Sequence, residues 1–201
     1  MADVFLQTLS TPAVVAAQRH YYGKSSNLGA PSGTDGLTPE EQAFIETRDS
    51  FYMATVTENG WPYVQHRGGP PGFLRVLHPG QIGFADFRGN RQMLSTGNLA
   101  ASDRVSLILM DYPRRERLKI LGHARVVDAR EHPELAARFG GPDRRAVVER
   151  VFLIDVVSYD WNCPQHITPR YTGAEVEALM APLRQRISEL ETIVSAPSKG
   201  S

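Results

Sequence analysis

Apolar and polar residues alternate along much of the central part of the chain, with the period of two that is typical of β-strands with one buried face. Six stretches between turn signals have strand character: 49–58, 61–77, 81–87, 104–110, 118–127 and 149–161. Glycines and prolines at 68–72 interrupt the second of these stretches. Glu58-Asn59-Gly60 separates the first two and is a typical hairpin turn. About six short strands with closely spaced turns predict a small antiparallel β-barrel rather than a doubly wound parallel sheet.

A second pattern, with apolar residues three and four positions apart, predicts helices around this barrel. It occurs at 13–20, after Thr38-Pro39, from Gln92 onwards, at 131–139 and from Gly173 to Val194. The last segment carries an apolar stripe, which must cover either the barrel or a second subunit. We therefore expect a mainly β fold with peripheral helices. Its predicted parts are an N-terminal helical extension and loop at 1–48, a barrel domain at 49–161, and a covering segment with a C-terminal helix at 162–201.

The junction between the strand at 81–87 and the helix after it carries the clearest candidate chemistry. It has the sequence Arg88-Gly89-Asn90-Arg91, in which Gly89 lets the backbone approach an anion and Asn90 is a helix-capping residue. Amides at the start of a helix attract phosphate, and each guanidinium offers a planar fork of donors to phosphate oxygens. The pattern indicates a phosphate site. The alternative is an ordinary capped turn with two solvated arginines.

Composition limits the kind of partner. The 201 residues include 22 basic and 22 acidic ones, so no global charge attracts nucleic acid or an anionic membrane. The single cysteine, Cys163, excludes an internal disulfide and a cysteine-rich metal site, and we expect no metal at His66 or His166, which lack a metal-binding spacing. No apolar run reaches the roughly 20 residues of a membrane span, and the first residues lack the pattern of a secretion signal. We therefore expect a cytoplasmic protein.

Three motifs in fixed order resemble one known family. They are Met-Ala-Thr-Val-Thr-Glu-Asn-Gly-Trp-Pro-Tyr at 53–63, Gly-Phe-Ala-Asp-Phe at 83–87 with Arg91 after it, and Arg-Val-Ser-Leu at 104–107. Together they look like the FMN-binding split-barrel family of pyridoxamine 5'-phosphate oxidase, over about 51–127. The resemblance implies a six-stranded antiparallel split β-barrel that forms a homodimer and binds one FMN in each of two clefts between the subunits.

The resemblance also implies which residues bind the cofactor. The family's phosphate turn falls on Gly89, Asn90 and Arg91, so Arg91 takes the role of the basic residue on the FMN phosphate. The family's arginine is absent at Asn90, and we expect Arg88 to replace its charge. The other positions that match flavin-contacting positions of the family are Gln65, His66, Arg67 and Gly68 on the second stretch, Phe84 and Ala85 before the turn, and Arg117 on a later strand.

The chain departs from the true oxidase of this family. Pro70 stands where that enzyme has a lysine, and the enzyme's substrate-phosphate residues and C-terminal Arg-x-His motif have no match, so oxidation of pyridoxine phosphate is not expected. The segments 65–72 and 161–170 instead resemble a subgroup of flavin-nucleotide-binding proteins. The residues expected on the substrate side of the flavin are Trp161, Gln165, His166 and Arg170. The alternatives are a barrel-corner bulge at 68–72 and an ordinary exit loop at 161–170.

We therefore expect an FMN-dependent oxidoreductase that acts on an unidentified small molecule, with NAD(P)H or oxygen as the other redox partner. The alternative is a flavin-nucleotide-binding carrier or sensor without turnover, because the sequence compels no acid–base residue. A deazaflavin or haem in the same barrel is a third hypothesis.

Overall fold

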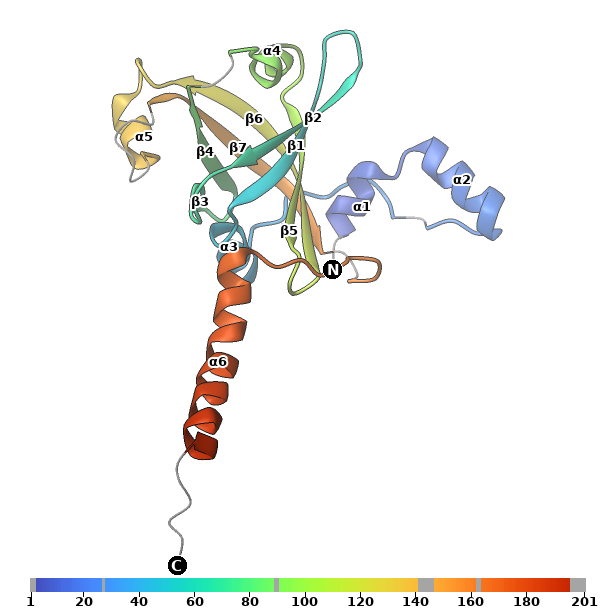
Figure 1. Ribbon diagram of the computed structural model, residues 1–201. Helices are drawn as coiled ribbons and strands as arrows, with labels where there is room; N and C mark the ends of the chain where they lie inside the picture. The colour runs from blue at the N-terminus through green and yellow to red at the C-terminus, as the bar shows by residue number, and fades with distance from the viewer. Residues whose placement is uncertain (1–2, 27, 89–90, 141–146, 162–163, 196–201) are drawn as a thin grey trace, which may run out of the picture.

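Seven strands form one antiparallel sheet in the computed structural model, which describes residues 3–26, 28–88, 91–140, 147–161 and 164–195 (Figure 1). The strands are β1 Ser50–Val56, β2 Pro62–Gly68, β3 Leu74–His78, β4 Gln81–Phe87, β5 Arg104–Asp111, β6 Glu116–Asp128 and β7 Val148–Trp161. Their order in the sheet is β2-β1-β5-β6-β7-β4-β3. The mainly β, antiparallel fold is confirmed. The expected count of about six is wrong by one strand, because the glycines and prolines at 68–72 separate β2 from β3.

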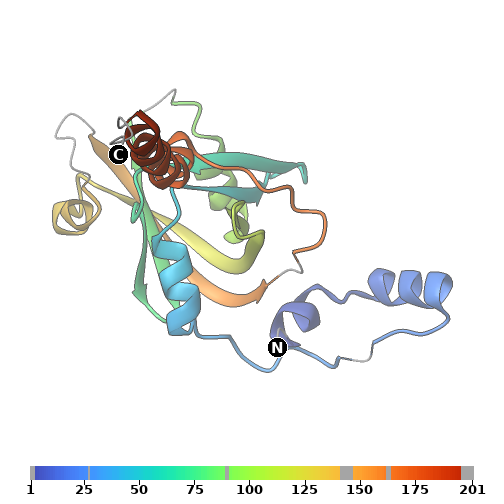
Figure 2. The ribbon, with the colours of Figure 1, turned by 60° about the horizontal axis from the view of Figure 1, so that its bottom comes forward.

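Six helices surround the sheet in the described part of the chain. They are α1 Asp3–Leu9, α2 Pro12–Tyr22, α3 Pro39–Glu46, α4 Leu94–Ala101, α5 Pro133–Arg138 and α6 Gly173–Ser195. In Figure 1, α3 and α4 lie at opposite ends of the sheet, and α1 with α2 forms an arm at one side. Figures 1 and 2 show α6 extending away from the sheet. No helix among the described residues combines the length and the apolar character needed to cross a membrane.

The sheet curls around a main apolar core. The rings of Phe51 on β1 and Phe84 on β4 lie 5.2 Å apart between centroids, although β5, β6 and β7 separate these two strands in the sheet. The curl has a local cause in β6, where the ladder with β7 shifts register between Leu121 and Gly122. A Cβ atom on Gly122 would lie 2.8 Å from the backbone oxygen of Asp155, so glycine is needed for this close approach. The edge strands β2 and β3 are not paired, and the barrel stays open between them.

Helix α3 closes one end of the barrel. Its start is fixed by a capping box between Thr38 and Glu41, with a proline at the first helical position. Phe44 and Ile45 on this helix then enter the main core together with strand residues. The described N-terminal region therefore supplies part of the barrel core, while the predicted division at 1–48, 49–161 and 162–201 stays a prediction.

Candidate functional site

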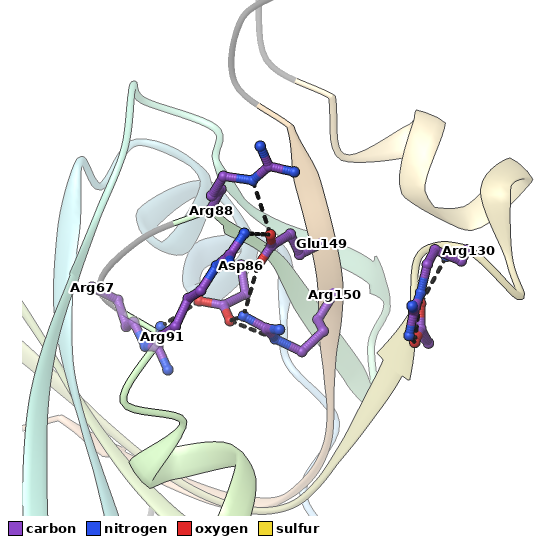
Figure 3. A network of polar contacts seen from close by, with 8 residues as sticks. Arg67, Asp86, Arg88, Arg91, Arg130, Glu149 and Arg150 are labelled. Carbon is purple, nitrogen blue, oxygen red and sulfur yellow. Dashed lines mark hydrogen bonds and ion pairs between the residues drawn. The ribbon is translucent and has the colours of Figure 1, made fainter.

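Six charged side chains gather where the sheet is open, on the side of the barrel that carries α4 (Figure 3). We call this group the arginine cluster, and its members are Arg67, Asp86, Arg88, Arg91, Glu149 and Arg150. Arg67 comes from β2, at one edge of the sheet, and Asp86 comes from β4, near the other edge. Asp86 also lies opposite Arg150 in the ladder between β4 and β7.

Asp86 is the centre of the inner half of this cluster. Its Oδ1 accepts a hydrogen bond from Nη1 of Arg67 at 2.8 Å, and its Oδ2 accepts one from Nε of Arg150 at 2.8 Å. All three side chains are largely buried, with 13 to 18% of each exposed. Because β2 and β4 share no backbone hydrogen bonds, the Arg67–Asp86 ion pair bridges the open seam of the barrel.

Arg67 loses most of its solvation in this position. Its guanidinium lies 5.4 Å from the ring centroid of Phe84 and 5.0 Å from that of Phe152, within the range of cation–π attraction. Burial lowers the pKa of Arg67 below the ordinary value of an arginine, and the neighbouring Asp86 carboxylate opposes that change. An arginine remains protonated under such a shift, so Arg67 carries a buried positive charge. Its Nε atom is buried without a hydrogen-bond partner among the described residues.

Glu149 organises the outer half of the cluster. Its Oε1 accepts a hydrogen bond from Nε of Arg88 at 3.1 Å, and Nη2 of Arg91 lies 3.7 Å from the same oxygen. The hydrogen bond from Arg88 is the main cause that lowers the pKa of Glu149, so this carboxyl is ionised at neutral pH. Arg88 and Arg91 are 60 and 66% exposed, which leaves most of each guanidinium accessible. The cluster contains four arginines and two carboxylates, and therefore an excess of positive charge.

A cavity of about 290 Å³ opens beside this charge excess. Its walls come from β2, β4, β7, the segment before α4 and the first turn of α4. The lining residues are Tyr63, Gln65, Arg67, Asp86, Phe87, Arg91, Gln92, Met93, Leu94, Ser95, Thr96 and Arg150. The Ser95 hydroxyl, in the first turn of α4, donates to the side-chain oxygen of Gln65 at 2.8 Å. Met93, the residue before α4, makes no side-chain capping bond, so the first amides of the helix have no cap there. The cavity therefore combines arginine donors with a helix start, a combination suited to an anion.

The start of α4 corrects one prediction from the sequence. The helix begins at Leu94 with Met93 as its N-cap, not at Gln92 with Asn90 as its cap. Arg91 and Met93 both have positive φ angles, of 58° and 60°, and this left-handed backbone delays the helix. Gly89 and Asn90 themselves lie outside the described residues.

The predicted cofactor residues divide between two faces of the sheet. Gln65 and Arg67 point into the cavity, together with Arg91 after β4. His66 lies on the opposite face of β2, where its ring is 5.4 Å from that of Tyr52 on β1. This division follows from the alternation of side chains along a strand. Gly68 shares the face of His66 by the same alternation, so the four positions 65–68 alternate between the two faces of β2. Their predicted contact with a flavin stays a prediction.

The remaining predicted residues lie around the cavity or away from it. Phe84 is in the main core below Arg67, and Ala85 belongs to a second apolar cluster with Val151. Arg88 contributes to the outer half of the cluster. Arg117 lies on β6 opposite Met110 and does not line the cavity. Its Nε is buried and has no hydrogen-bond partner within the residues that the structure describes.

The C-terminal candidates have partners elsewhere in the same chain. Nε1 of Trp161 donates to Glu41 at 2.6 Å, and its ring packs edge-on against Phe44 of α3. The guanidinium of Arg170 lies 5.1 Å from the ring centroid of Tyr112. Gln165 and His166 are exposed and do not line the 290 Å³ cavity. Their predicted place on the substrate side of a flavin stays a prediction, and Asn162 and Cys163 lie outside the described residues.

Sequence reasoning missed four residues of this site: Asp86, Ser95, Glu149 and Arg150. A carboxylate within the apolar strand at 81–87 was an available signal, because a buried charge needs a partner. The identity of that partner was not available, since Arg150 is 64 positions away and only the register of β4 and β7 brings it to Asp86.

Comparison with known proteins shows the family of the chain. The sequence model described as Pyridoxamine 5'-phosphate oxidase matches residues 37–155, which is more than half of the chain. The chain belongs to the pyridoxamine 5'-phosphate oxidase family. The match spans the barrel from just before α3 into β7, and it includes all of the arginine cluster. No curated protein matches the chain.

Solved structures with a related fold are distant in sequence. A putative pyridoxamine 5'-phosphate oxidase from Lactobacillus delbrueckii is 21% identical, with 63% of this chain and 95% of its own covered and a TM-score of 0.49. HupZ from Group A Streptococcus is 15% identical, with coverages of 67 and 99% and a TM-score of 0.48. An FMN-binding protein from Syntrophomonas wolfei is 10% identical, with coverages of 62 and 87% and a TM-score of 0.43. The family assignment therefore rests on the match to residues 37–155.

Proposed function

We propose that the protein is an FMN-dependent oxidoreductase that holds the flavin phosphate in the arginine cluster and acts on a small molecule. The observation that carries this proposal is the cavity beside the cluster, where arginine donors exceed carboxylates and one buried guanidinium nitrogen lacks a partner among the described residues. A phosphate dianion in the cavity supplies the missing negative charge and offers acceptors to the arginine donors that reach it. Membership of the family, in which flavin binding is common, supports FMN as the source of that phosphate.

Each part of the cluster has a separate role in this proposal. Arg91 and the first amides of α4 bind phosphate oxygens from the open side of the cavity. Asp86 holds Arg67 and Arg150 at fixed positions, so their remaining donors stay aimed at the ligand. When bound, FMN supplies the electron chemistry, and the protein supplies binding and orientation.

A second subunit is part of the proposal. A cavity of about 290 Å³ is at the lower limit for a complete ligand pocket, and the flavin ring would extend beyond it. The outward face of β1, β2 and β5 carries exposed apolar side chains beside this region, namely Tyr52, Val56, Val64 and Ile108. A contiguous exposed apolar face of this kind is typical of a protein interface. A homodimer formed through it would complete the flavin cleft.

One observation favours the carrier or sensor as a second candidate. Asp86 is the single carboxylate among the described residues that line the cavity, and two arginines already occupy it. It is therefore not available as a catalytic base. A protein that only stores or senses the flavin needs no such base.

Binding of FMN and riboflavin to wild type and to Arg91→Ala tests the phosphate site. We expect the variant to lose roughly 1.5–3 kcal/mol of FMN binding, the contribution of one charge-assisted hydrogen bond, and to bind riboflavin as wild type does. Arg114→Ala, on the turn after β5, is the matched control and keeps both affinities. Equal affinity of the wild type for FMN and riboflavin would refute the phosphate role. Stopped-flow reduction of the holoprotein by NADH and NADPH then separates the oxidoreductase from the carrier.

A further inference from the structure

Helix α6 is formed and capped without help from the barrel. At its start, the backbone N–H of Thr172 donates to Oε2 of Glu175 at 2.7 Å, and the N–H of Glu175 donates back to the Thr172 hydroxyl at 3.2 Å, which is a capping box. Ion pairs then link Arg184 to Glu177 and Arg186 to Glu189 along its surface. None of its described side chains is buried, and the helix points away from the sheet (Figures 1 and 2).

Six of the exposed apolar residues of α6 nevertheless follow a regular spacing, and two more, Leu179 and Ile193, lie beside them. Val176, Met180, Leu183, Ile187, Leu190 and Val194 are separated by alternating steps of four and three residues, and each is between 40 and 84% exposed. Alternating steps of three and four define the a and d positions of a coiled coil. In this register Met180, Ile187 and Val194 take position a, and Val176, Leu183 and Leu190 take position d.

The residues at each heptad position indicate how many helices would pair and in which direction. Within a parallel coil, β-branched residues at a with leucine at d, as in Ile187, Leu190 and Val194, favour two helices over three or four. Arg186 then takes position g and Glu191 the following e position, so in a parallel pair each Arg186 faces the Glu191 of the other helix. Within the described residues the carboxylate of Glu191 has no ion pair of its own.

An antiparallel pair of the same helices has the opposite electrostatics. Full antiparallel overlap would place Arg184 against Arg184 and Glu177 against Glu191, which are pairs of like charge. Pro182, inside the helix, takes position c on the side away from the apolar seam, so it does not obstruct a partner.

We propose that α6 pairs with α6 of a second copy of this chain as a short parallel coiled coil. Such a coil runs along the twofold axis of a homodimer and places both barrels at the same end. A helix of 23 residues is marginal as an isolated coil, so α6 adds to the contact between the barrels rather than replacing it. This pairing does not depend on flavin binding, because no described residue of α6 lines the cavity beside the arginine cluster.

Disulfide trapping tests both the pairing and its direction. In a Cys163→Ser background, which removes the one native thiol, Val194→Cys places a cysteine at position a, and Thr192→Cys places one on the outer face as the matched control. We expect the disulfide-linked dimer of Val194→Cys to exceed that of the control by about fivefold or more, because the paired Cβ atoms lie within disulfide reach only across the seam. Equal trapping of both variants would overturn the pairing. Preferential linkage of Val194→Cys to a Val176→Cys chain would overturn its direction.

Sedimentation of the full chain measures what the coil contributes. Ile187→Asp should raise the dimer dissociation constant by about tenfold or more, while Gln185→Asp on the outer face leaves it unchanged. Arg186→Glu and Glu191→Arg should each weaken the dimer, and the double substitution should restore it. FMN affinity, measured on the same samples, separates this proposal from the proposed function. A dimer constant that is unaffected by Ile187→Asp would overturn the coiled coil even where FMN binds normally.

Discussion

Both ends of the barrel contain buried charged side chains, but the partners of these side chains differ between the two ends. At the α4 end, the arginine cluster has more cations than carboxylates, a guanidinium nitrogen without a partner among the described residues, and a cavity beside it. At the α3 end, Glu41 accepts hydrogen bonds from Thr38 and Trp161, and Asp111 pairs with Arg48 at 2.9 Å. At the α3 end each of these carboxylates therefore has its hydrogen-bond or ion-pair partners within the chain. The α4 end is balanced only if a ligand supplies negative charge.

This difference separates structural charges from functional ones. A buried polar group whose partners all come from its own chain fixes the geometry of the fold and leaves nothing to bind. A group held in place with donors to spare is prepared for a ligand, at a cost to the stability of the free protein. Substitutions at the two ends should therefore affect stability alike and ligand binding differently.

Removing the central carboxylate should have the largest effect. Asp86→Ala leaves Arg67 and Arg150 buried beside each other without their counter-ion, and we expect the free energy of unfolding to fall by about 3 kcal/mol. FMN should restore more stability to this variant than to wild type, because its phosphate replaces the lost charge. Urea denaturation with and without FMN measures both effects. Asp111→Ala is the control, and it should lose a similar amount of unfolding free energy without any additional stabilisation by FMN. A variant that FMN stabilises less than wild type would contradict the prediction.

Glu41 should show a smaller effect that depends on pH. Burial alone would raise its pKa, but hydrogen bonds from Thr38 and Trp161 outweigh it, and the pKa lies below the usual value. The ionised form therefore stabilises the fold above the unfolded pKa of about 4.3, and this contribution disappears as the pH falls through the folded pKa. Glu41→Gln should cost about 1.5 kcal/mol at pH 7, with FMN affinity unchanged.

The measurement is urea denaturation of wild type and Glu41→Gln between pH 3 and pH 8. This range includes the unfolded-state pKa of about 4.3, near which the stability difference should change. The difference in stability should be constant above about pH 6 and should shrink below about pH 4. Glu46→Gln, an exposed position on the same helix, provides the control and should match wild type throughout. A difference that grows on acidification would mean that the pKa of Glu41 is raised, not lowered.

Substitutions on the two faces of β2 should give the smallest difference in FMN affinity. Gln65→Ala removes the acceptor of the Ser95 hydroxyl in the cavity wall, and we expect FMN to bind about fivefold more weakly, which corresponds to roughly 1 kcal/mol. His66→Ala, one position away on the outward face that the proposed homodimer would cover, removes no group from the cavity wall and should weaken FMN binding less than Gln65→Ala does. Isothermal titration of both variants decides this. Equal losses would show that the ligand reaches both faces of the strand.

Local patterns in the sequence were enough to predict most of the fold. Alternation, apolar runs and turn signals together located the segments that form the seven strands, and the Thr38-Pro39-Glu40-Glu41 signal located α3. These elements depend on neighbours within a few residues. The start of α4 was misplaced because Arg91 and Met93 adopt a left-handed backbone that their residue types do not favour. No local pattern in the sequence indicates that conformation.

The candidate site was only partly accessible to the same reasoning. Arg91 and Arg67 were identified through the family motif, and both line the cavity. Arg150 and Glu149 were not identified, because they enter the site through the pairing of β4 with β7. The separation of His66 from Gln65 needs no such long-range contact, because the alternation of side chains along a strand is enough to place them on opposite faces.

The open seam has one further consequence, for how the free chain avoids aggregation. β2 is hydrogen-bonded to β1 alone, so its other edge has unpaired backbone groups of the kind that recruit strands from other molecules. Two of its residues oppose such recruitment: Pro62 lacks a backbone donor, and Arg67 places a charge across the gap to β4. The same guanidinium that we assign to a ligand site thus keeps β2 from acting as a template for misassembly.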